Sequence, residues 1–151
     1  TMIRKIEKTD RELFLRLTRE FYASPAVLHP VPDAYHTAVF EEMMRSDLYA
    51  EGYLLEYDGI PSGYALLAKT YSHEAGGLVV WIEEIYTVPE MRGKGLGREF
   101  FAFLERQYGA SAMRLRLETE PENKKAEALY RKLGFQELGY RQFVKERQQT
   151  V

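Results

Sequence analysis

Residues 87–97 read Thr-Val-Pro-Glu-Met-Arg-Gly-Lys-Gly-Leu-Gly and separate an apolar run from an amphipathic run. This order predicts a strand, a glycine-rich loop and the start of a helix. Gly93, Gly95 and Gly97 alternate with larger residues, so every second Cβ is missing and the loop amides can approach a phosphate together. A helix that opens at Leu96 or Gly97 adds unpaired N–H groups and the positive end of its dipole. The stretch therefore predicts a phosphate site, with an ordinary glycine-rich turn as the alternative.

Three cations surround this loop, which suits a diphosphate better than a single carboxylate: Arg92, Lys94 and Arg98. Two better-known phosphate loops do not fit these letters. A P-loop needs Ser or Thr after its lysine to hold magnesium, but Lys94 is followed by Gly95. A dinucleotide fingerprint needs Gly-x-Gly-x-x-Gly, whereas the spacing here is Gly-x-Gly-x-Gly. Both of these interpretations are therefore rejected.

The spacing Arg92-x-x-Gly95-x-Gly97 resembles the acetyl-CoA pyrophosphate loop of the GCN5-related N-acetyltransferases. A second block, residues 123–135, is similar to the other signature of that family: an Asn, a helix that carries Leu-Tyr130, then Gly-Phe. Two such motifs in the family order support each other. The resemblance extends over the whole chain.

This resemblance implies an α/β fold, with a mixed central sheet of about six or seven strands and about four helices. It also implies that residues 1–151 form a single N-acetyltransferase domain. The apolar periodicity predicts helices at about 11–22, 34–47, 96–108 and 122–133, and strands at about 3–7, 53–57, 63–71, 78–88 and 113–118, with a final strand pair at about 135–146.

Composition limits the possible classes of protein. A chain of 151 residues can bury roughly 68–70% of its unfolded surface but is too short for two ordinary domains. The net charge of −2 argues against a general nucleic-acid binder. The absence of cysteine excludes disulfides and an acyl-cysteine intermediate. No apolar run approaches the ~20 residues of a membrane-spanning helix and no signal pattern opens the chain, so we expect a cytoplasmic enzyme without membrane contact.

Glu83 and Glu84 stand together inside the apolar run at 78–88. Adjacent strand residues point to opposite faces, so the two carboxylates share a face only if a bulge intervenes. At least one of them enters apolar surroundings, where burial raises the pKa of a carboxyl and suits it to act as a base. The alternative for either residue is an outward-facing glutamate on a half-solvated strand.

Residues 82–86 resemble the Leu-Glu-Asp-hydrophobic-aromatic segment of the diamine and polyamine acetyltransferase branch. By this resemblance Glu83 is the base that removes the amine proton, and Glu84 lies near the amine acceptor. The resemblance also implies that three consecutive residues hydrogen-bond the thioester through their backbone: Ile85, Tyr86 and Thr87. It assigns the pyrophosphate to Arg92, Gly93, Lys94, Gly95, Leu96, Gly97 and Arg98.

Tyr130 lies on the inward stripe of its predicted helix, where a tyrosine is ordinarily a core residue. In the family, the equivalent hydroxyl protonates the departing CoA thiolate, and a phenol can fill that role. Asn123 resembles the residue that binds the pantetheine arm, with a helix N-cap as the alternative role.

The sequence leaves several polar residues open. We expect no metal site, because His29, His36 and His73 stand far apart and share no element with an acid at ligand spacing. Four tyrosines of the first half are either core residues or the lining of an amine pocket: Tyr22, Tyr35, Tyr49 and Tyr71.

These features predict an acetyl-CoA-dependent N-acetyltransferase that passes the acetyl group directly to a primary amine of a small molecule. Two alternatives remain: acetylation of a protein N-terminus or lysine, and a CoA-binding regulatory module without activity. The oligomeric state, a homodimer included, cannot be inferred from the sequence.

Overall fold

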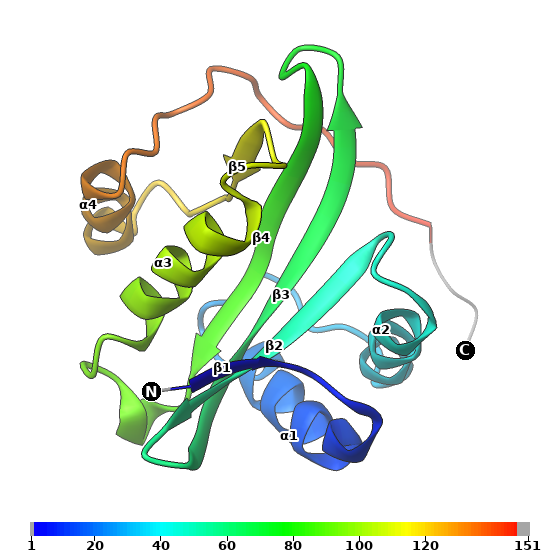
Figure 1. The fold of residues 1–151 in the computed structure, drawn as a ribbon. Helices are drawn as coiled ribbons and strands as arrows, with labels where there is room; N and C mark the ends of the chain where they lie inside the picture. Colours follow the sequence, from blue (N-terminus) through cyan, green and yellow to red (C-terminus); the bar gives the residue numbers. More distant parts are fainter. Residues whose placement is uncertain (1, 148–151) are drawn as a thin grey trace. The chain divides into compact units, whose positions relative to one another are not determined.

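The computed structural model describes residues 2–147, in which strands and helices follow in the order shown in Figure 1. The elements are β1 (Met2–Lys5), α1 (Arg11–Tyr22), α2 (Ala34–Arg45), β2 (Ala50–Tyr57), β3 (Ile60–Ser72), β4 (Gly77–Thr87), α3 (Leu96–Tyr108), β5 (Arg114–Arg116) and α4 (Lys124–Lys132), with short 3-10 turns at Lys8–Asp10 and Pro89–Met91. The chain divides after residue 117 into two compact units, which we describe separately. The single domain over residues 1–151 stays a prediction.

The N-terminal unit is built on a five-stranded sheet in the order β1-β2-β3-β4-β5. The first four strands are antiparallel neighbours, and β5 pairs parallel with β4. The helix α3 connects β4 to β5, which is the crossover that two parallel strands require. The predicted mixed α/β architecture is therefore confirmed, with fewer strands than expected.

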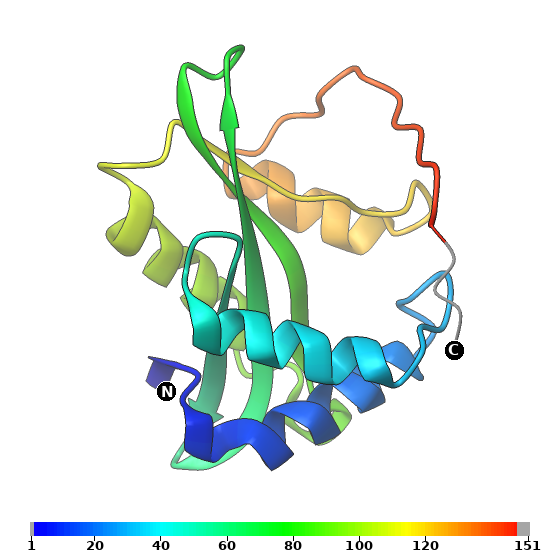
Figure 2. The same ribbon diagram turned by 90° about the vertical axis from the view of Figure 1, so that its right-hand side faces the viewer.

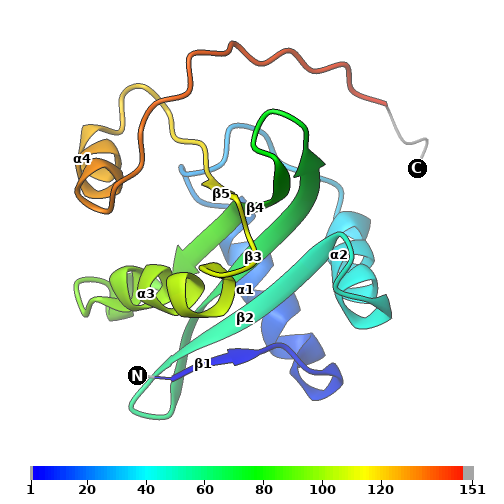
Figure 3. The same ribbon diagram turned by 45° about the horizontal axis from the view of Figure 1, so that its top comes forward.

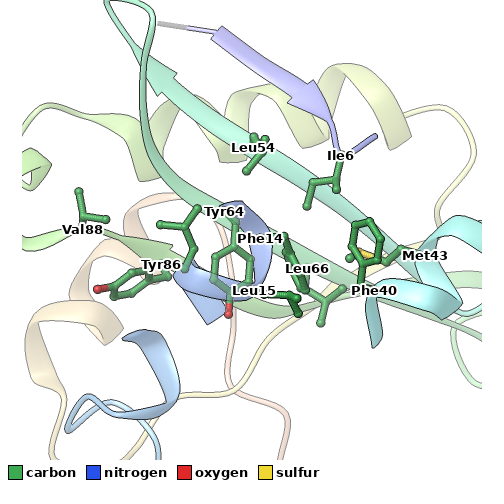
Figure 4. Packing of buried hydrophobic residues seen from close by; sticks show 11 residues of the cluster. Ile6, Phe14, Leu15, Phe40, Met43, Leu54, Tyr64, Leu66, Tyr86 and Val88 are labelled. Atoms are coloured by element: carbon green, nitrogen blue, oxygen red, sulfur yellow. The ribbon is translucent and has the colours of Figure 1, made fainter. Parts of the chain in front are cut away.

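Helices cover both faces of this sheet, as Figures 2 and 3 show. On one face, Phe14 of α1 packs edge-on against Tyr64 of β3 with 5.4 Å between the ring centroids. On the other face, Tyr53 of β2 packs against Phe103 of α3 at 5.0 Å. Side chains alternate along a strand, so Tyr53 faces α3 while its neighbour Leu54 joins the core under α1 and α2 (Figure 4).

The spacing of apolar residues explains why α1 forms where it does. Phe14, Leu17 and Phe21 recur at three and four residues and form one stripe, and the first two are fully buried. Burial of each such side chain stabilises the fold by about 1.5–3 kcal/mol. These contacts hold α1 against β3 and β4, next to the candidate site.

The predicted strand pair at 135–146 is wrong. The structure has no strand between residues 135 and 147, and Phe143 and Val144 are 91% and 80% exposed. Alternating apolar residues become a strand only when a sheet edge pairs with them, and an isolated hairpin is marginally stable. The predicted strand at 113–118 is likewise shorter, because its pairing with β4 is limited to Arg114–Arg116.

Candidate active site

A β-bulge lies at Glu83 in β4. Glu84 pairs with Leu66 of β3 whereas Ile82 pairs with Leu67, so Glu83 is the extra residue between them. A bulge interrupts the strict alternation of side chains and re-aims the residues beside it. The bulge at Glu83 therefore allows the carboxylates of Glu83 and Glu84 to approach the same face of the sheet. Consistent with this, the charges of Glu83 and Glu84 both act on the hydroxyl of Tyr22.

The edge of β4 that faces away from β3 is paired over only part of its length. The pairing with β5 spans Val79 to Trp81, and among the described residues no strand pairs with the rest of this edge. The N–H of Val88 donates to the carbonyl of Ser62 in β3, so it points toward β3. Because N–H groups alternate along a strand, those of Ile85 and Thr87 point to the other edge. The N–H groups of Ile85 and Thr87 thus lie where β5 has left β4, whereas the N–H of Tyr86, the third predicted donor, points toward β3.

The glycine-rich loop has the backbone geometry that a phosphate loop requires. Gly93 and Gly95 have φ angles of 78° and 80°, in the left-handed region that favours glycine. Gly95 caps α3, and the N–H of Glu99 makes a helical bond of 3.0 Å to the Gly95 carbonyl. The amides of residues 96–98 therefore stand in the first turn, ahead of the helical ladder.

A Cβ at Gly93, Gly95 or Gly97 would meet no heavy atom within 4 Å, so internal crowding does not explain the three glycines. Gly97 also lacks a positive φ angle. Open space over a run of glycine amides at a helix N-terminus fits an anion that approaches the backbone closely. The backbone of the loop therefore fits a diphosphate.

The three cations of the loop are exposed, while Leu96 between them is 3% exposed and anchors α3 in the core. Arg92 donates from Nε to the Thr87 carbonyl at 3.1 Å, which ties the loop to the end of β4. The Nζ of Lys94 lies 5.0 Å from the centre of the Tyr57 ring. Both side chains keep exposed charge beside the glycines.

Glu84 is partly buried and accepts hydrogen bonds on both carboxylate oxygens. Tyr64 donates to Oε1 at 2.7 Å, and Tyr22 donates to Oε2 at 2.5 Å. Burial, together with the bond to Glu84, raises the pKa of Tyr22 well above its usual range. Burial and the negative charge of Glu84 do the same to the pKa of Tyr64. Both tyrosines therefore stay protonated and act as donors.

Glu83, by contrast, is exposed. The burial that the sequence analysis expected for one member of the pair occurs at Glu84, so burial gives no reason to choose Glu83 as the base. The assignment of Glu83 to proton removal stays a prediction.

The remaining predicted site residues lie in the C-terminal unit. Asn123 caps α4, with its Oδ1 accepting the Ala126 N–H at 3.2 Å, so the N-cap role is present. Burial raises the pKa of Tyr130, whose ring lies 6.1 Å from that of Phe135. That these residues share one site with the loop and β4 stays a prediction.

Sequence reasoning missed the residues that hold Glu84. The sequence alone leaves Tyr22 among four tyrosines with two possible roles and does not mark Tyr64 as a site residue. The available signal was the spacing of Thr18 and Tyr22, which stand one helical turn apart on α1 and place two hydroxyls on one side.

Within residues 2–147, no cluster of three or more His, Cys, Asp or Glu side chains could hold a metal ion. None of the helices described there is long and apolar enough to cross a membrane.

The fold is of the α/β class, and a glycine-rich loop leads into a helix N-terminus beside a partly unpaired strand. The sequence model of the Acetyltransferase (GNAT) family matches residues 12–135. The chain belongs to this family, and the prediction of an N-acetyltransferase is confirmed.

Two curated relatives cover most of the chain. Thialysine N-epsilon-acetyltransferase of Mus musculus is 30% identical over 91% of this chain and 85% of its own length. Aminoglycoside N(6')-acetyltransferase type 1 of Salmonella enteritidis is 27% identical over 89% of this chain and 91% of its own length. A solved aminoglycoside N-acetyltransferase in complex with CoA is 25% identical, with a TM-score of 0.76 and coverage of 97% of this chain and 94% of that one.

Proposed function

We propose that this protein transfers the acetyl group of acetyl-CoA directly to a primary amine of a small molecule. One observation carries the proposal: the outward amides of Ile85 and Thr87 lie on the edge that β5 leaves, and Arg92 fixes the glycine loop to the end of the same strand. A thioester carbonyl and a diphosphate, which acetyl-CoA carries at a distance from each other, match these two sets of donors.

In this proposal the chain's own residues have separate tasks. The loop from Arg92 to Arg98 binds the pyrophosphate, and the outward amides of Ile85 and Thr87 hold the thioester carbonyl as negative charge develops on it. Asn123 hydrogen-bonds the pantetheine arm. Glu83 accepts the proton that the amine must lose, and Tyr130 donates a proton to the departing sulfur.

The small-amine acceptor is supported by Glu84 and by the names of the relatives. Glu84 places a carboxylate beside the bulge, with tyrosine hydroxyls on both oxygens. Two curated relatives are named for transfer to amines, of an aminoglycoside and of thialysine. We therefore propose a small amine that carries a second cationic group.

The experiment that tests the reaction is turnover of acetyl-CoA with a panel of diamines, monoamines and lysine peptides, measured as free thiol. Turnover with the small amines is expected. Turnover with peptides alone would move the activity to protein acetylation. Binding of CoA without any turnover would make the protein a CoA-binding regulatory module.

The glycine loop offers a matched pair of variants. Gly95→Ala should raise the Kd for acetyl-CoA by about tenfold or more, because the side chain obstructs the approach of phosphate to the amides. Gly76→Ala is the control, since Gly76 has nearly the same φ angle, 79°, and open space around it but lies in the turn after β3. Titration calorimetry measures both. Equal effects would assign the loss to backbone strain and contradict the loop assignment.

Tyr130→Phe should lower kcat by about 10- to 1,000-fold while the Kd for acetyl-CoA stays close to that of the parent, because only a proton donor is lost. Tyr140→Phe is the control, since Tyr140 is 65% exposed in the same unit. An unchanged kcat in Tyr130→Phe would make Tyr130 a core residue.

A further inference from the structure

A chain of hydrogen-bonding side chains leads from a buried histidine to Glu84. His36 Nδ1 lies 3.2 Å from Thr18 Oγ1, which lies 3.4 Å from the Tyr64 hydroxyl. Tyr64 then contacts Glu84 at 2.7 Å. His36, Thr18 and Tyr64 are 5%, 1% and 0% exposed, so water does not compete for these bonds. The chain links α2 and α1 to β3 and β4.

Each hydroxyl carries one proton, and Tyr64 donates it in a hydrogen bond to Glu84, which is nearer at 2.7 Å than Thr18 at 3.4 Å. The hydroxyl of Thr18 can donate either to the Tyr64 oxygen or to Nδ1 of His36, since both lie within reach. In the direction tested below, Thr18 donates to Tyr64 and accepts from the Nδ1–H of His36. Every bond then points toward Glu84, and each bond polarises the next.

Tyr22 completes the arrangement from the other side. It donates to the second carboxylate oxygen at 2.5 Å, and its ring lies edge-on against the ring of His36, with 5.3 Å between the centroids. Within residues 2–147, both hydrogen bonds to the Glu84 carboxylate thus come from neutral hydroxyl donors. Neutral donors hold a carboxylate in place without cancelling its charge.

We propose that Tyr64, Thr18 and His36 are positioning residues that fix Glu84 as an oriented anion for the second cationic group of a diamine or polyamine acceptor. The inference rests on the acceptor role proposed above for Glu84. A carboxylate that packed donors already hold in one orientation loses little conformational entropy when it binds a cation. The second amine of the acceptor therefore contributes more to kcat/KM. The chain acts only through Glu84 and does not touch the reacting atoms.

The direction of the chain can be tested without any substrate. Nitrogen-15 spectra of the parent protein at about pH 8.5, where an ordinary imidazole is neutral, distinguish the two histidine tautomers. His36→Gln identifies the signals of His36. We expect a proton on Nδ1 of His36, and a loss of that preference in Thr18→Val. A proton on Nε2 alone in the parent would overturn the proposal.

The functional consequence is measured as the ratio of kcat/KM for a diamine to that for its methyl-ended monoamine. Tyr64→Phe should lower this ratio by about 3- to 30-fold, since one charge-assisted bond to Glu84 is lost. Thr18→Val, which keeps the shape of the side chain, should lower it by about 2- to 5-fold, and Thr18→Ser, which keeps the hydroxyl, should restore it. Tyr53→Phe is the control, because Tyr53 donates to the carboxylate of Glu51 on the opposite face.

The outcomes separate this proposal from the one on which it rests. If Glu84→Gln lowers the ratio but Tyr64→Phe and Thr18→Val do not, Glu84 keeps its acceptor role and the positioning chain is refuted. If Glu84→Gln leaves the ratio unchanged while turnover persists, the acceptor role fails and the chain has no function in recognition. A lower ratio in Thr18→Val that Thr18→Ser restores would support the positioning chain, since a general loss of stability would not discriminate between two substrates.

Discussion

Glu51 and Glu84 are carboxylates on opposite faces of one sheet, and each accepts hydrogen bonds from the hydroxyl groups of two tyrosines. Glu51, on the α3 face, is 4% exposed and bonds Tyr53 and Tyr108, the latter at 2.7 Å. It also accepts from the Nζ of Lys69 at 2.5 Å. Glu84, on the α1 face, is bonded by tyrosines alone within the described part of the chain.

The two carboxylates differ in whether a cation of the chain accompanies them. Lys69 neutralises Glu51, so that cluster is electrostatically complete and has no capacity for a ligand cation. Burial acts to raise the pKa of Glu51, but the hydrogen bonds from Lys69 and the two tyrosines outweigh it, and the net pKa lies below its usual range. Glu84 has the tyrosine donors without a cation, and in the function proposed above the acceptor supplies the counter-ion.

The largest effect is expected from removing the cation at Glu51. Lys69→Met should lower the free energy of unfolding by about 3–5 kcal/mol, because it leaves a buried carboxylate without its counter-ion. Urea denaturation measures the change. Arg45→Met is the control, since it breaks the exposed pair with Glu42 and should change the free energy of unfolding far less. Similar losses in both variants would mean that Glu51 is not a closed ion pair.

The second prediction exchanges the carboxylates for amides. Glu84→Gln should lower kcat/KM for a diamine by about 10- to 150-fold and affect the methyl-ended monoamine far less, since a charge-assisted bond is lost. Glu51→Gln should leave the ratio between the two substrates unchanged, although it destabilises the fold. Glu83→Gln should lower the rates with both substrates and shift the alkaline pH dependence. Equal losses for both substrates in Glu84→Gln would remove the contrast between the two faces.

Much of the fold was predictable because its signals are local. The stripe of α1, the glycines before α3 and the alternation in β3 and β4 depend on residues close in sequence. The strand pair predicted at 135–146 failed for the opposite reason. A strand needs a partner that lies elsewhere in the chain, and the local alternation around Phe143 carries no information about that partner.

The candidate site divides in the same way. The loop from Arg92 to Arg98 could be predicted from one short stretch, as could the condition that Glu83 and Glu84 share a face only if a bulge intervenes. The chain behind Glu84 could not, because its contacts join residues that are 18, 20 and 46 positions apart. Only the folded sheet brings α1, α2 and β4 together.

The smallest expected effect is a reversal in how stability depends on pH. In the parent the pKa of Glu51 is lowered, so its contribution to stability is fully present above its unfolded value of about 4.5 and is lost as the pH falls through the folded value.

In Lys69→Met the burial of Glu51 is no longer opposed by a cation, and we expect its pKa to lie above the unfolded value. The carboxyl then stabilises the fold below about pH 4.5 and loses that contribution as the pH rises through the folded value. Each case changes the free energy of unfolding by at most about 1.4 kcal/mol per pH unit, the limit for one proton. The free energy of unfolding is measured by urea denaturation between about pH 3 and pH 8. The parent is compared with Glu51→Gln, and Lys69→Met is compared with the double variant that also carries Glu51→Gln. These two differences isolate the contribution of Glu51 from that of the other carboxyls. If stability depends on pH with the same sign in both comparisons, the tyrosines alone keep Glu51 ionised without Lys69. Glu51 and Glu84 would then differ in their position in the fold and not in their need for a counter-ion.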